Sequence, residues 1–362
     1  MSPGGNDPEN VCRGRPVPPL PQFPGGVNIS AMLRSVFRGT GFAVPERVVT
    51  NDELAAVMDT SDEWIRTRTG IAERRWVREG ETGADLALRA SRAALEAAGI
   101  GPGDLDAIIC ATSTPDHFAP GNGVYLQHLL GAGPIPALDI RAQCSGFVYA
   151  LSVADAWIRA GAYRTILVVG VEIQSTGMDV STAGRNTAVI FADGAGAAVL
   201  GPGEDPSRGI LGFDLHSDGA WADKLWVDAP GSMYHPRITQ EAVAAGRHLL
   251  QMDGKEVFRQ AVVRMPESVH TLLSRLGLSP ADIGLLLPHQ ANLRISEMVQ
   301  RTLGLRDDQV YNNITRYGNT TAATIPIALD ECVRSGRIAA GDLVVMTAFG
   351  SGFMWGSAAV RW

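Results

Sequence analysis

Cys144 is the residue whose surroundings best suit nucleophilic chemistry. It lies in ALDIRAQCSGFVYALSVADAWIRAG, where a short strand is predicted to end near Arg141 and an amphipathic helix to begin just after the cysteine. A thiol at a helix N-terminus meets the positive end of the helix dipole and free N–H groups, which favour thiolate and can also receive an oxyanion. The alternative is a small buried core thiol, which the contexts of Cys110 (AIICA) and Cys332 (a helix face) indicate for those residues.

Two further polar residues stand at junctions of apolar segments. His289 follows a predicted buried strand in GLLLPHQANLRI, and ligand-handling groups gather at the carboxyl ends of strands in α/β sheets. Asn319 lies in NITRYGNTTAATIPIALDE, between a predicted strand and a helix. Taken singly, His289 could be a structural histidine and Asn319 a turn or N-cap residue.

The elements that must position these residues alternate between strands and helices. Continuous apolar runs predict strands covered on both faces, and longer periodic runs predict helices. The fold class is therefore α/β, with mostly parallel sheets. The predicted strands are 105–111, 137–140, 165–171, 195–200, 283–287, 343–348 and 357–360, and the predicted helices include 84–98, 147–160, 256–276 and 325–335.

An internal repeat divides the chain. Residues 93–112 (AALEAAGIGPGDLDAIICAT) match residues 271–290 (TLLSRLGLSPADIGLLLPHQ), with Gly99 and Gly277 offset by 178 residues. The repeat predicts two related α/β halves, at 33–205 and 206–362, with a site shared between them. Asn319 follows Cys144 at close to this offset, so we expect it to hold roughly the place in the second half that Cys144 holds in the first.

The ends and the composition set outer bounds on function. Residues 1–32, which contain Cys12, are rich in Pro and Gly and are predicted to be a disordered extension, with an ordered arm as the alternative and Met32 as a possible start. A net charge of −7 argues against nucleic acid as a partner, and no apolar run is long enough to span a membrane. Four dispersed cysteines without a CxxC predict reduced thiols in a cytoplasmic protein.

Together, Cys144, His289 and Asn319 resemble the Cys-His-Asn set of the β-ketoacyl-acyl-carrier-protein synthase III family, condensing enzymes with a thiolase-like fold. The resemblance runs from about residue 35 to the C-terminus. It is carried by TNDELAAVMDTSDEWIRTRTGIAER, AQCSGFVYALSVAD, FADGAGAAVL, PHQANLRI, YGNTTAATIPIAL and GSGFMWGSA. It implies two duplicated halves packed as αβαβα layers.

The resemblance implies a two-stage reaction. Cys144 would take an acyl group from acyl-CoA, and malonyl-acyl carrier protein would then lose CO2 and attack the acyl-Cys. His289 and Asn319 would donate hydrogen bonds to the malonyl thioester oxygen, and the backbone N–H groups of Cys144 and Ser351 would form the oxyanion hole. No metal or other cofactor is implied, since the CoA thioester is itself a substrate.

The resemblance also implies a CoA site. Trp64 and Arg185 would sandwich the adenine, although a partly buried core aromatic is the alternative for Trp64. The remaining residues assigned to CoA are Thr60, Arg68, Gly254, Asn292 and Arg294.

The acyl pocket is assigned to Phe118, Ala119 and Phe349. Many members of the family carry a large aromatic residue at the place of Ala119, so we expect a primer longer than acetyl. The sequence Phe349-Gly350-Ser351-Gly352 replaces a glycine triplet of the family, and a backbone N–H survives that change.

The resemblance further implies a homodimer and docking of acyl carrier protein on arginines at the entrance. The candidates are Arg66, Arg68, Arg74, Arg75 and Arg294. Two alternatives remain open. One is an enzyme of specialised metabolism that uses a second acyl thioester or an oxygen or nitrogen acceptor. The other is a non-catalytic thiolase-fold partner subunit, against which the intact Cys-His-Asn set argues.

Overall fold

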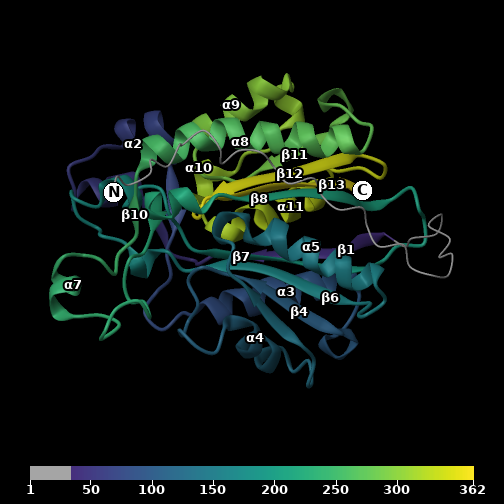
Figure 1. Ribbon diagram of the computed structural model, residues 1–362, viewed down its shortest axis with the longest axis horizontal. Helices are drawn as coiled ribbons and strands as arrows, with labels where there is room; N and C mark the ends of the chain where they lie inside the picture. The colour runs from purple at the N-terminus through teal and green to yellow at the C-terminus, as the bar shows by residue number, and fades with distance from the viewer. Residues whose placement is uncertain (1–33) are drawn as a thin grey trace, which may run out of the picture. The chain divides into compact units, whose positions relative to one another are not determined.

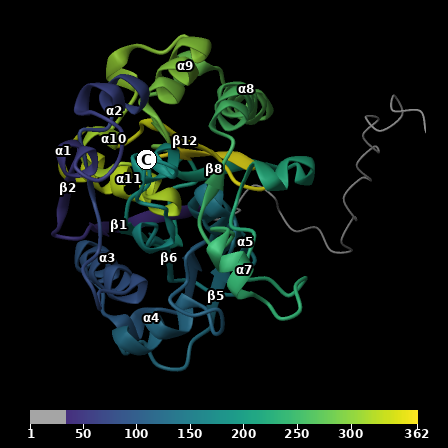
Figure 2. The same ribbon diagram turned by 90° about the vertical axis from the view of Figure 1, so that its left-hand side faces the viewer.

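Two β-sheets lie one above the other with helices on both faces of each (Figures 1 and 2). The computed structural model describes residues 34–362. The first sheet has the order β1 (Ser35–Ala43), β7 (Gly194–Pro202), β6 (Ile166–Glu172), β4 (Ala107–Ala111) and β5 (Ala137–Ile140). The second has the order β11 (Leu285–Pro288), β12 (Leu343–Gly350), β13 (Met354–Arg361) and β8 (Gly209–Ser217).

Helices complete five layers, as Figure 1 shows from bottom to top. Helices α3 (Gly83–Ala98) and α4 (Asn122–Leu130) cover the outer face of the first sheet. Helices α5 (Gly146–Arg159) and α11 (Thr324–Arg334) lie between the sheets. Helices α8 (Gly254–Arg275) and α9 (Leu293–Leu303) cover the second sheet. The predicted α/β layering is therefore present.

Shorter elements frame the region that becomes the site. They are β2 (Val48–Thr50), α1 (Asn51–Ala55), α2 (Asp62–Thr69), β3 (Glu73–Arg75), α6 (Arg185–Ala188), β9 (Leu225–Trp226), α7 (Gln240–Ala244), β10 (Gln251–Met252) and α10 (Ile314–Tyr317).

The sheets are mixed, and the prediction of mostly parallel sheets is wrong. In the first sheet β4 runs parallel to β5 and β6, but β7 is antiparallel to both β6 and β1. In the second, β11 and β12 are parallel while β13 is antiparallel to β12 and β8. Only residues 351–353 join β12 to β13, and so short a connection can only reverse the chain.

The two sheets share one topology. The order β1-β7-β6-β4 and the order β8-β13-β12-β11 have the same sequence of antiparallel, antiparallel and parallel pairs. All strands of the first sheet come from residues 35–202 and all of the second from residues 209–361. Residues 34–362 nevertheless belong to one compact unit, so the boundary at 205/206 stays a prediction.

Glycines let α11 and the turn before it rest directly on the first sheet. A Cβ on Gly170 of β6 would lie 2.4 Å from the carbonyl oxygen of Ala322. A Cβ on Gly196 of β7 would lie 2.7 Å from Cβ of Pro326. This close approach brings the segment that carries Asn319 into the space between the sheets.

Within residues 34–362, no helix has both the length and the apolar character needed to span a membrane. Residues 1–32, with Cys12 and Met32, lie outside the described part of the chain, and the predictions made for them stay predictions. Cys110 and Cys332 are buried in β4 and α11, as their contexts predicted.

Candidate active site

Cys144 lies in a tight turn between a strand and a helix. Strand β5 ends at Ile140, a 3-10 turn covers Gln143–Ser145, and α5 begins at Gly146. Gln143 has φ of 45°, a left-handed backbone that is uncommon for a residue other than glycine. Such conformations persist where the surrounding structure enforces them, often at functional sites. The turn holds Cys144 at 4% exposure.

The sulfur of Cys144 accepts hydrogen bonds from two backbone N–H groups, its own and that of Ser351. These are the two groups assigned to the oxyanion hole. Ser351 follows β12, whose last residue, Gly350, passes so close that a Cβ there would lie 2.8 Å from the sulfur. The end of the second sheet is thus brought against the nucleophile of the first half.

Burial raises the pKa of the Cys144 thiol to about 12, and the nearby charge of Glu172 adds to the rise, while the two N–H bonds oppose it. The expectation of a thiolate at the helix N-terminus therefore does not hold for the free protein. Desolvation of the charged sulfur outweighs the donors that would stabilise it. A thiol in this state would have to lose its proton as it reacts.

His289 lies just after β11, where its N–H donates to the carbonyl of Thr347 at 2.8 Å. The side chain is 2% exposed, and burial lowers its pKa to about 3, so the imidazole is neutral near pH 7. Its Nδ1 is 2.7 Å from Thr324 Oγ1. Its Nε2 is buried and has no hydrogen-bond partner within residues 34–362.

The Thr324 hydroxyl determines whether His289 Nε2 is a hydrogen-bond donor or an acceptor. The Thr324 hydroxyl lies 3.1 Å from the carbonyl of Thr321, which already accepts the backbone N–H of Thr324. When the hydroxyl donates to that carbonyl, His289 Nδ1 must carry the proton and Nε2 is an acceptor. When the hydroxyl donates to Nδ1, Nε2 carries the proton and is a donor.

Asn319 is held in one amide orientation. Its backbone forms an isolated bridge to Phe191, and its N–H donates to the carbonyl of Ile190 at 2.9 Å. Its Oδ1 accepts the N–H of Thr321 at 2.8 Å, so the Nδ2 group remains as the donor at the cavity. The side chain is 4% exposed.

The counterpart of Cys144 in the second half is Ala322, not Asn319. The turn Thr321–Ala323 precedes α11 as Gln143–Ser145 precedes α5, at the repeat offset of 178 residues. Thr321 has φ of 51°, which repeats the left-handed backbone of Gln143. Asn319 lies just before this turn, so its correspondence with Cys144 is only approximate.

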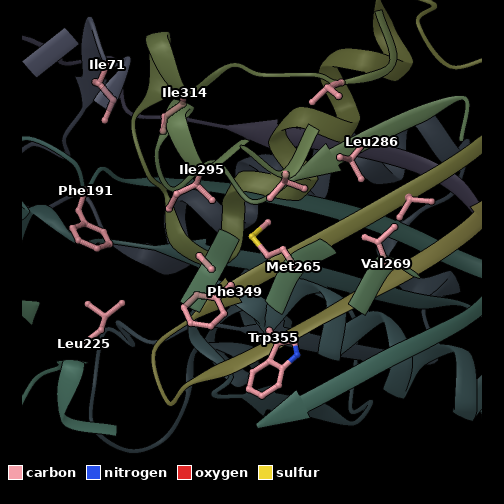
Figure 3. Close-up of a cluster of buried hydrophobic side chains, with 14 of the residues drawn as sticks. Ile71, Phe191, Leu225, Met265, Val269, Leu286, Ile295, Ile314, Phe349 and Trp355 are labelled. Carbon is pink, nitrogen blue, oxygen red and sulfur yellow. The ribbon is translucent and has the colours of Figure 1, made fainter. Parts of the chain in front are cut away.

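A cavity of about 490 Å³ joins the three residues: Cys144, His289 and Asn319 all line it. Phe191, Leu225, Ile295 and Phe349 also line it and belong to a buried apolar cluster (Figure 3). The remaining lining includes five of the residues assigned to CoA: Trp64, Arg68, Gly254, Asn292 and Arg294. Lys255, at the start of α8, lines the same cavity and was not predicted.

Trp64 and Arg185 are in direct contact. The guanidinium carbon of Arg185 lies 5.0 Å from the Trp64 ring centre, and that of Arg68 lies 4.9 Å from the same ring. Arg185 also donates to the carbonyl of Asp59. Because aromatic rings stack at similar separations, an adenine could enter between Trp64 and Arg185 only if they moved apart. Neither Arg185 nor Thr60 lines the cavity, and Thr60 Oγ1 is buried without a partner in the described chain.

Asn292 has a structural task as well. Its Oδ1 caps α9 by accepting the N–H of Arg294 at 2.9 Å, and its Nδ2 donates to the carbonyl of Arg68 at 2.9 Å. It thus ties α9 to α2 across the cavity wall.

The three residues assigned to the acyl pocket do not lie together in the structure. Phe349 lines the large cavity, but Phe118 is 63% exposed with Arg237 over its ring, and Ala119 is exposed on the same loop. Neither Phe118 nor Ala119 lines a cavity at Cys144 of its own chain. Their role stays a prediction. A second cavity of about 250 Å³ does adjoin Cys144 and Ser351, and its lining was not predicted apart from those two residues.

Arg74 must be removed from the candidates for carrier-protein docking. It is fully buried and donates to Asn51 and to the carbonyls of Val49 and Val189. Burial lowers its pKa to about 10. Arg66, Arg68 and Arg294 remain exposed, and Arg75 pairs with Glu73. In the described residues no cluster of three His, Cys, Asp or Glu side chains could hold a metal ion.

Comparisons with known proteins give one consistent family. Residues 138–219 match the model of 3-oxoacyl-[acyl-carrier-protein] synthase III, and residues 273–362 match the model of its C-terminal part. The chain is 46% identical to the β-ketoacyl-[acyl-carrier-protein] synthase III of Cereibacter sphaeroides over 337 residues, covering 91% of this chain and 99% of that protein.

Solved structures agree. The 3-oxoacyl-[acyl-carrier-protein] synthase III of Aquifex aeolicus VF5 is 40% identical with a TM-score of 0.83, covering 91% of this chain and all of that chain. The priming β-ketosynthase of the R1128 polyketide pathway is 35% identical with a TM-score of 0.83, covering 93% and 98%. These likenesses confirm the predicted thiolase-like fold.

Proposed function

The chain belongs to the β-ketoacyl-[acyl-carrier-protein] synthase III family, and on that premise we propose that it joins an acyl group from acyl-CoA to a malonyl unit on acyl carrier protein. The products are 3-oxoacyl-acyl carrier protein, CoA and CO2, which is the first condensation of fatty acid synthesis. The observation that carries the proposal is the buried Cys144 sulfur under two N–H donors, in one cavity with neutral His289 and Asn319.

In the first stage the Cys144 sulfur attacks the thioester carbonyl. The bond from sulfur to the acyl carbon forms as the bond from that carbon to the CoA sulfur breaks, and the thiol proton ends on CoA. The N–H groups of Cys144 and Ser351, which meet at this sulfur, stabilise the oxyanion of the tetrahedral intermediate. With Thr324 donating to the Thr321 carbonyl, His289 Nε2 can accept the thiol proton on its way to CoA.

In the second stage, loss of CO2 from the malonyl group leaves an enolate. Asn319 Nδ2 and His289 Nε2–H stabilise its oxygen by hydrogen bonds. The enolate carbon attacks the acyl carbon, the bond from that carbon to the Cys144 sulfur breaks, and the released thiolate takes a proton from solvent. A neutral imidazole suits this stage, because with Thr324 donating to Nδ1 the proton lies on Nε2.

Substrate binding follows the charges around the cavity. Arg68, Lys255 and Arg294 line it and supply cations for the phosphates of CoA, while Trp64 and Arg185 would receive the adenine. Arg66, Arg68 and Arg294 are the exposed arginines proposed to meet the acidic carrier protein.

We also propose that the protein is a homodimer joined through the first sheet. Strand β5 is the last strand of that sheet, and its outer edge has no strand partner within residues 34–362. Its Leu138 is 37% exposed, and Val124 and Leu129 of α4 and Phe118 of the preceding loop add exposed apolar side chains. Pairing with β5 of a second copy would cover both the open edge and these side chains.

Intact-mass measurement tests the first stage. Wild-type protein incubated with acyl-CoA should gain one acyl mass, and Cys144→Ala should gain none. His289→Ala and Asn319→Ala should form 3-oxoacyl product with malonyl-acyl carrier protein at least about a hundredfold more slowly. An adduct on Cys144→Ala, or none on the wild type, would remove the nucleophile.

Acceptors other than malonyl-acyl carrier protein are tested separately, because a polyketide priming enzyme is among the similar structures. The acylated protein should be offered malonyl-acyl carrier protein, a second acyl thioester and simple amines or alcohols, with product identification by mass. Turnover with malonyl-acyl carrier protein well above the others is the expected result.

A further inference from the structure

The cavity of about 250 Å³ beside Cys144 is the space into which an acyl group on its sulfur can extend. It adjoins Cys144 and Ser351, while the larger cavity holds the basic residues proposed for CoA. At about 30 Å³ for each water-sized group, it has room for roughly eight non-hydrogen atoms. Trp226, Val227 and Leu250 are among the apolar residues that line it.

Polar side chains also line this cavity, and part of their hydrogen-bonding capacity is not used within the described residues. Gln143 Oε1 is buried and has no partner among the described residues. Gln174 is 6% exposed, and its Nε2 donates to Thr321 Oγ1 at 2.9 Å and to Glu172 Oε2 at 3.4 Å. No hydrogen bond within residues 34–362 involves its Oε1. An alkyl chain packed against the Gln174 amide would cover its Oε1 without supplying a hydrogen-bond donor, which is unfavourable.

The buried carboxyl group of Glu172, next to this cavity, favours a neutral ligand. Glu172 is fully buried and accepts hydrogen bonds from Ser113 Oγ at 2.9 Å and Thr114 Oγ1 at 2.6 Å, and both of these residues line the cavity. Burial raises the pKa of Glu172 to about 7, so part of the population carries a negative charge at neutral pH. A second carboxylate would be repelled there. Arg141, on the same lining, is exposed to solvent and screened.

We propose that Cys144 is acylated preferentially by a short acyl-CoA whose chain bears an uncharged hydrogen-bonding group, a hydroxyl above all, which Gln143 and Gln174 bind. A hydroxyl both donates and accepts, so it can satisfy an amide in either orientation. The inference rests on the proposed function, because it takes Cys144 as the acyl carrier.

The test compares donors matched in length. Butyryl-CoA is paired with 3-hydroxybutyryl-CoA, and hexanoyl-CoA with 5-hydroxyhexanoyl-CoA, with succinyl-CoA as the charged donor. Acylation of the full chain is followed by rapid quench and intact mass, so that the rate on Cys144 is measured directly. At least one hydroxylated donor should react about tenfold faster than its alkyl match, and succinyl-CoA should be slower than both.

Gln174→Leu should bring that ratio close to one by slowing the hydroxylated donor and speeding the alkyl donor. Gln240→Leu, an exposed change at the start of α7, is the matched control and should keep the wild-type ratio. The thermal midpoint of both variants is measured alongside, and the wild-type ratio decides the question even if Gln174→Leu fails to fold.

The outcomes separate the two proposals. Alkyl donors that acylate Cys144 as fast as the hydroxylated ones would overturn the pocket inference and leave the proposed function standing. Succinyl-CoA as the fastest donor would overturn it in favour of carboxylate binding by Arg141. Failure of every donor to acylate Cys144 would overturn both.

Discussion

At the scale of single residues, the site works through neutral groups. The Cys144 thiol has a raised pKa and the His289 imidazole a lowered one, so neither is charged at neutral pH. A hydrated thiol and imidazole with their ordinary pKa values would also be mostly neutral together, and burial moves both groups further from forming an ion pair. Here the charge has to appear during the reaction, where the N–H groups of Cys144 and Ser351 meet it.

Alkylation of Cys144 by iodoacetamide should therefore be slow near neutral pH. The thiolate fraction of a thiol with a pKa near 12 rises with pH, so the rate should increase roughly tenfold per pH unit from about pH 7 to 9. Peptide mapping separates Cys144 from the other cysteines, and Cys144→Ser supplies the background. A rate that stays flat above pH 7 would mean that the free protein already holds a thiolate.

Thr324 should matter more for condensation than its distance from the substrate indicates. Thr324→Val cannot donate to His289 Nδ1, so Nε2 loses its fixed proton and kcat for condensation should fall about tenfold or more. The KM for malonyl-acyl carrier protein should change little.

Thr324→Ser keeps the hydroxyl and should restore most of the rate, which distinguishes proton placement from simple packing. Equal condensation rates in the valine variant and the wild type would show that the hydroxyl does not position the His289 proton.

The residues proposed to react could be predicted from the sequence, but the residues that position them could not. Cys144, His289 and Asn319 each stand at a visible break in an apolar run, and the structure brings all three to one cavity. Thr324 lies five residues after Asn319 in the same motif, but a threonine that begins a helix has no signal of its own. Gln143 and Gln174 follow β5 and β6 of the first sheet, but the cavity that they line is completed by residues of the second half such as Leu250 and Ser351.

At the scale of elements, the end of β12 fixes the geometry of the nucleophile. Gly350→Ala would place a Cβ 2.5 Å from Cys144 Cβ and 2.8 Å from its sulfur, so the turn or the strand must shift. Acylation of Cys144 should fall by about a hundredfold or more.

Gly219→Ala is the control for this change, since a Cβ there meets no atom within 4 Å. Rates of acyl-enzyme formation and thermal midpoints are compared for the two variants. Normal acylation of Gly350→Ala would mean that the approach of β12 is not required.

Buried elements were the predictable ones. Strands β4, β6 and β12 are covered on both faces, and their continuous apolar runs located each to within a few residues. Strand β1 was missed because SVFRGTGFA interrupts its pattern with arginine and glycine. Strand direction was misjudged because it depends on connections rather than on the composition of the strand itself.

At the scale of the whole molecule, the open edge of β5 is the feature that a second copy would cover. Leu138→Lys places a charge on that edge and should convert the proposed dimer into a monomer in sedimentation experiments at micromolar concentration. Val263→Lys, an exposed apolar residue on α8, is the control and should leave the assembly unchanged. A wild-type monomer at all concentrations would contradict the homodimer.

The contact between Arg185 and Trp64 has a consequence for turnover. Arg185 lies over the ring of Trp64, and a cation–aromatic contact of this kind is worth about 0.5–1 kcal/mol. If the adenine of CoA binds between these two side chains, as proposed, its arrival would break the contact and its departure would let the contact re-form. The pair would then act as an internal competitor that shortens the residence time of spent CoA before the carrier protein binds.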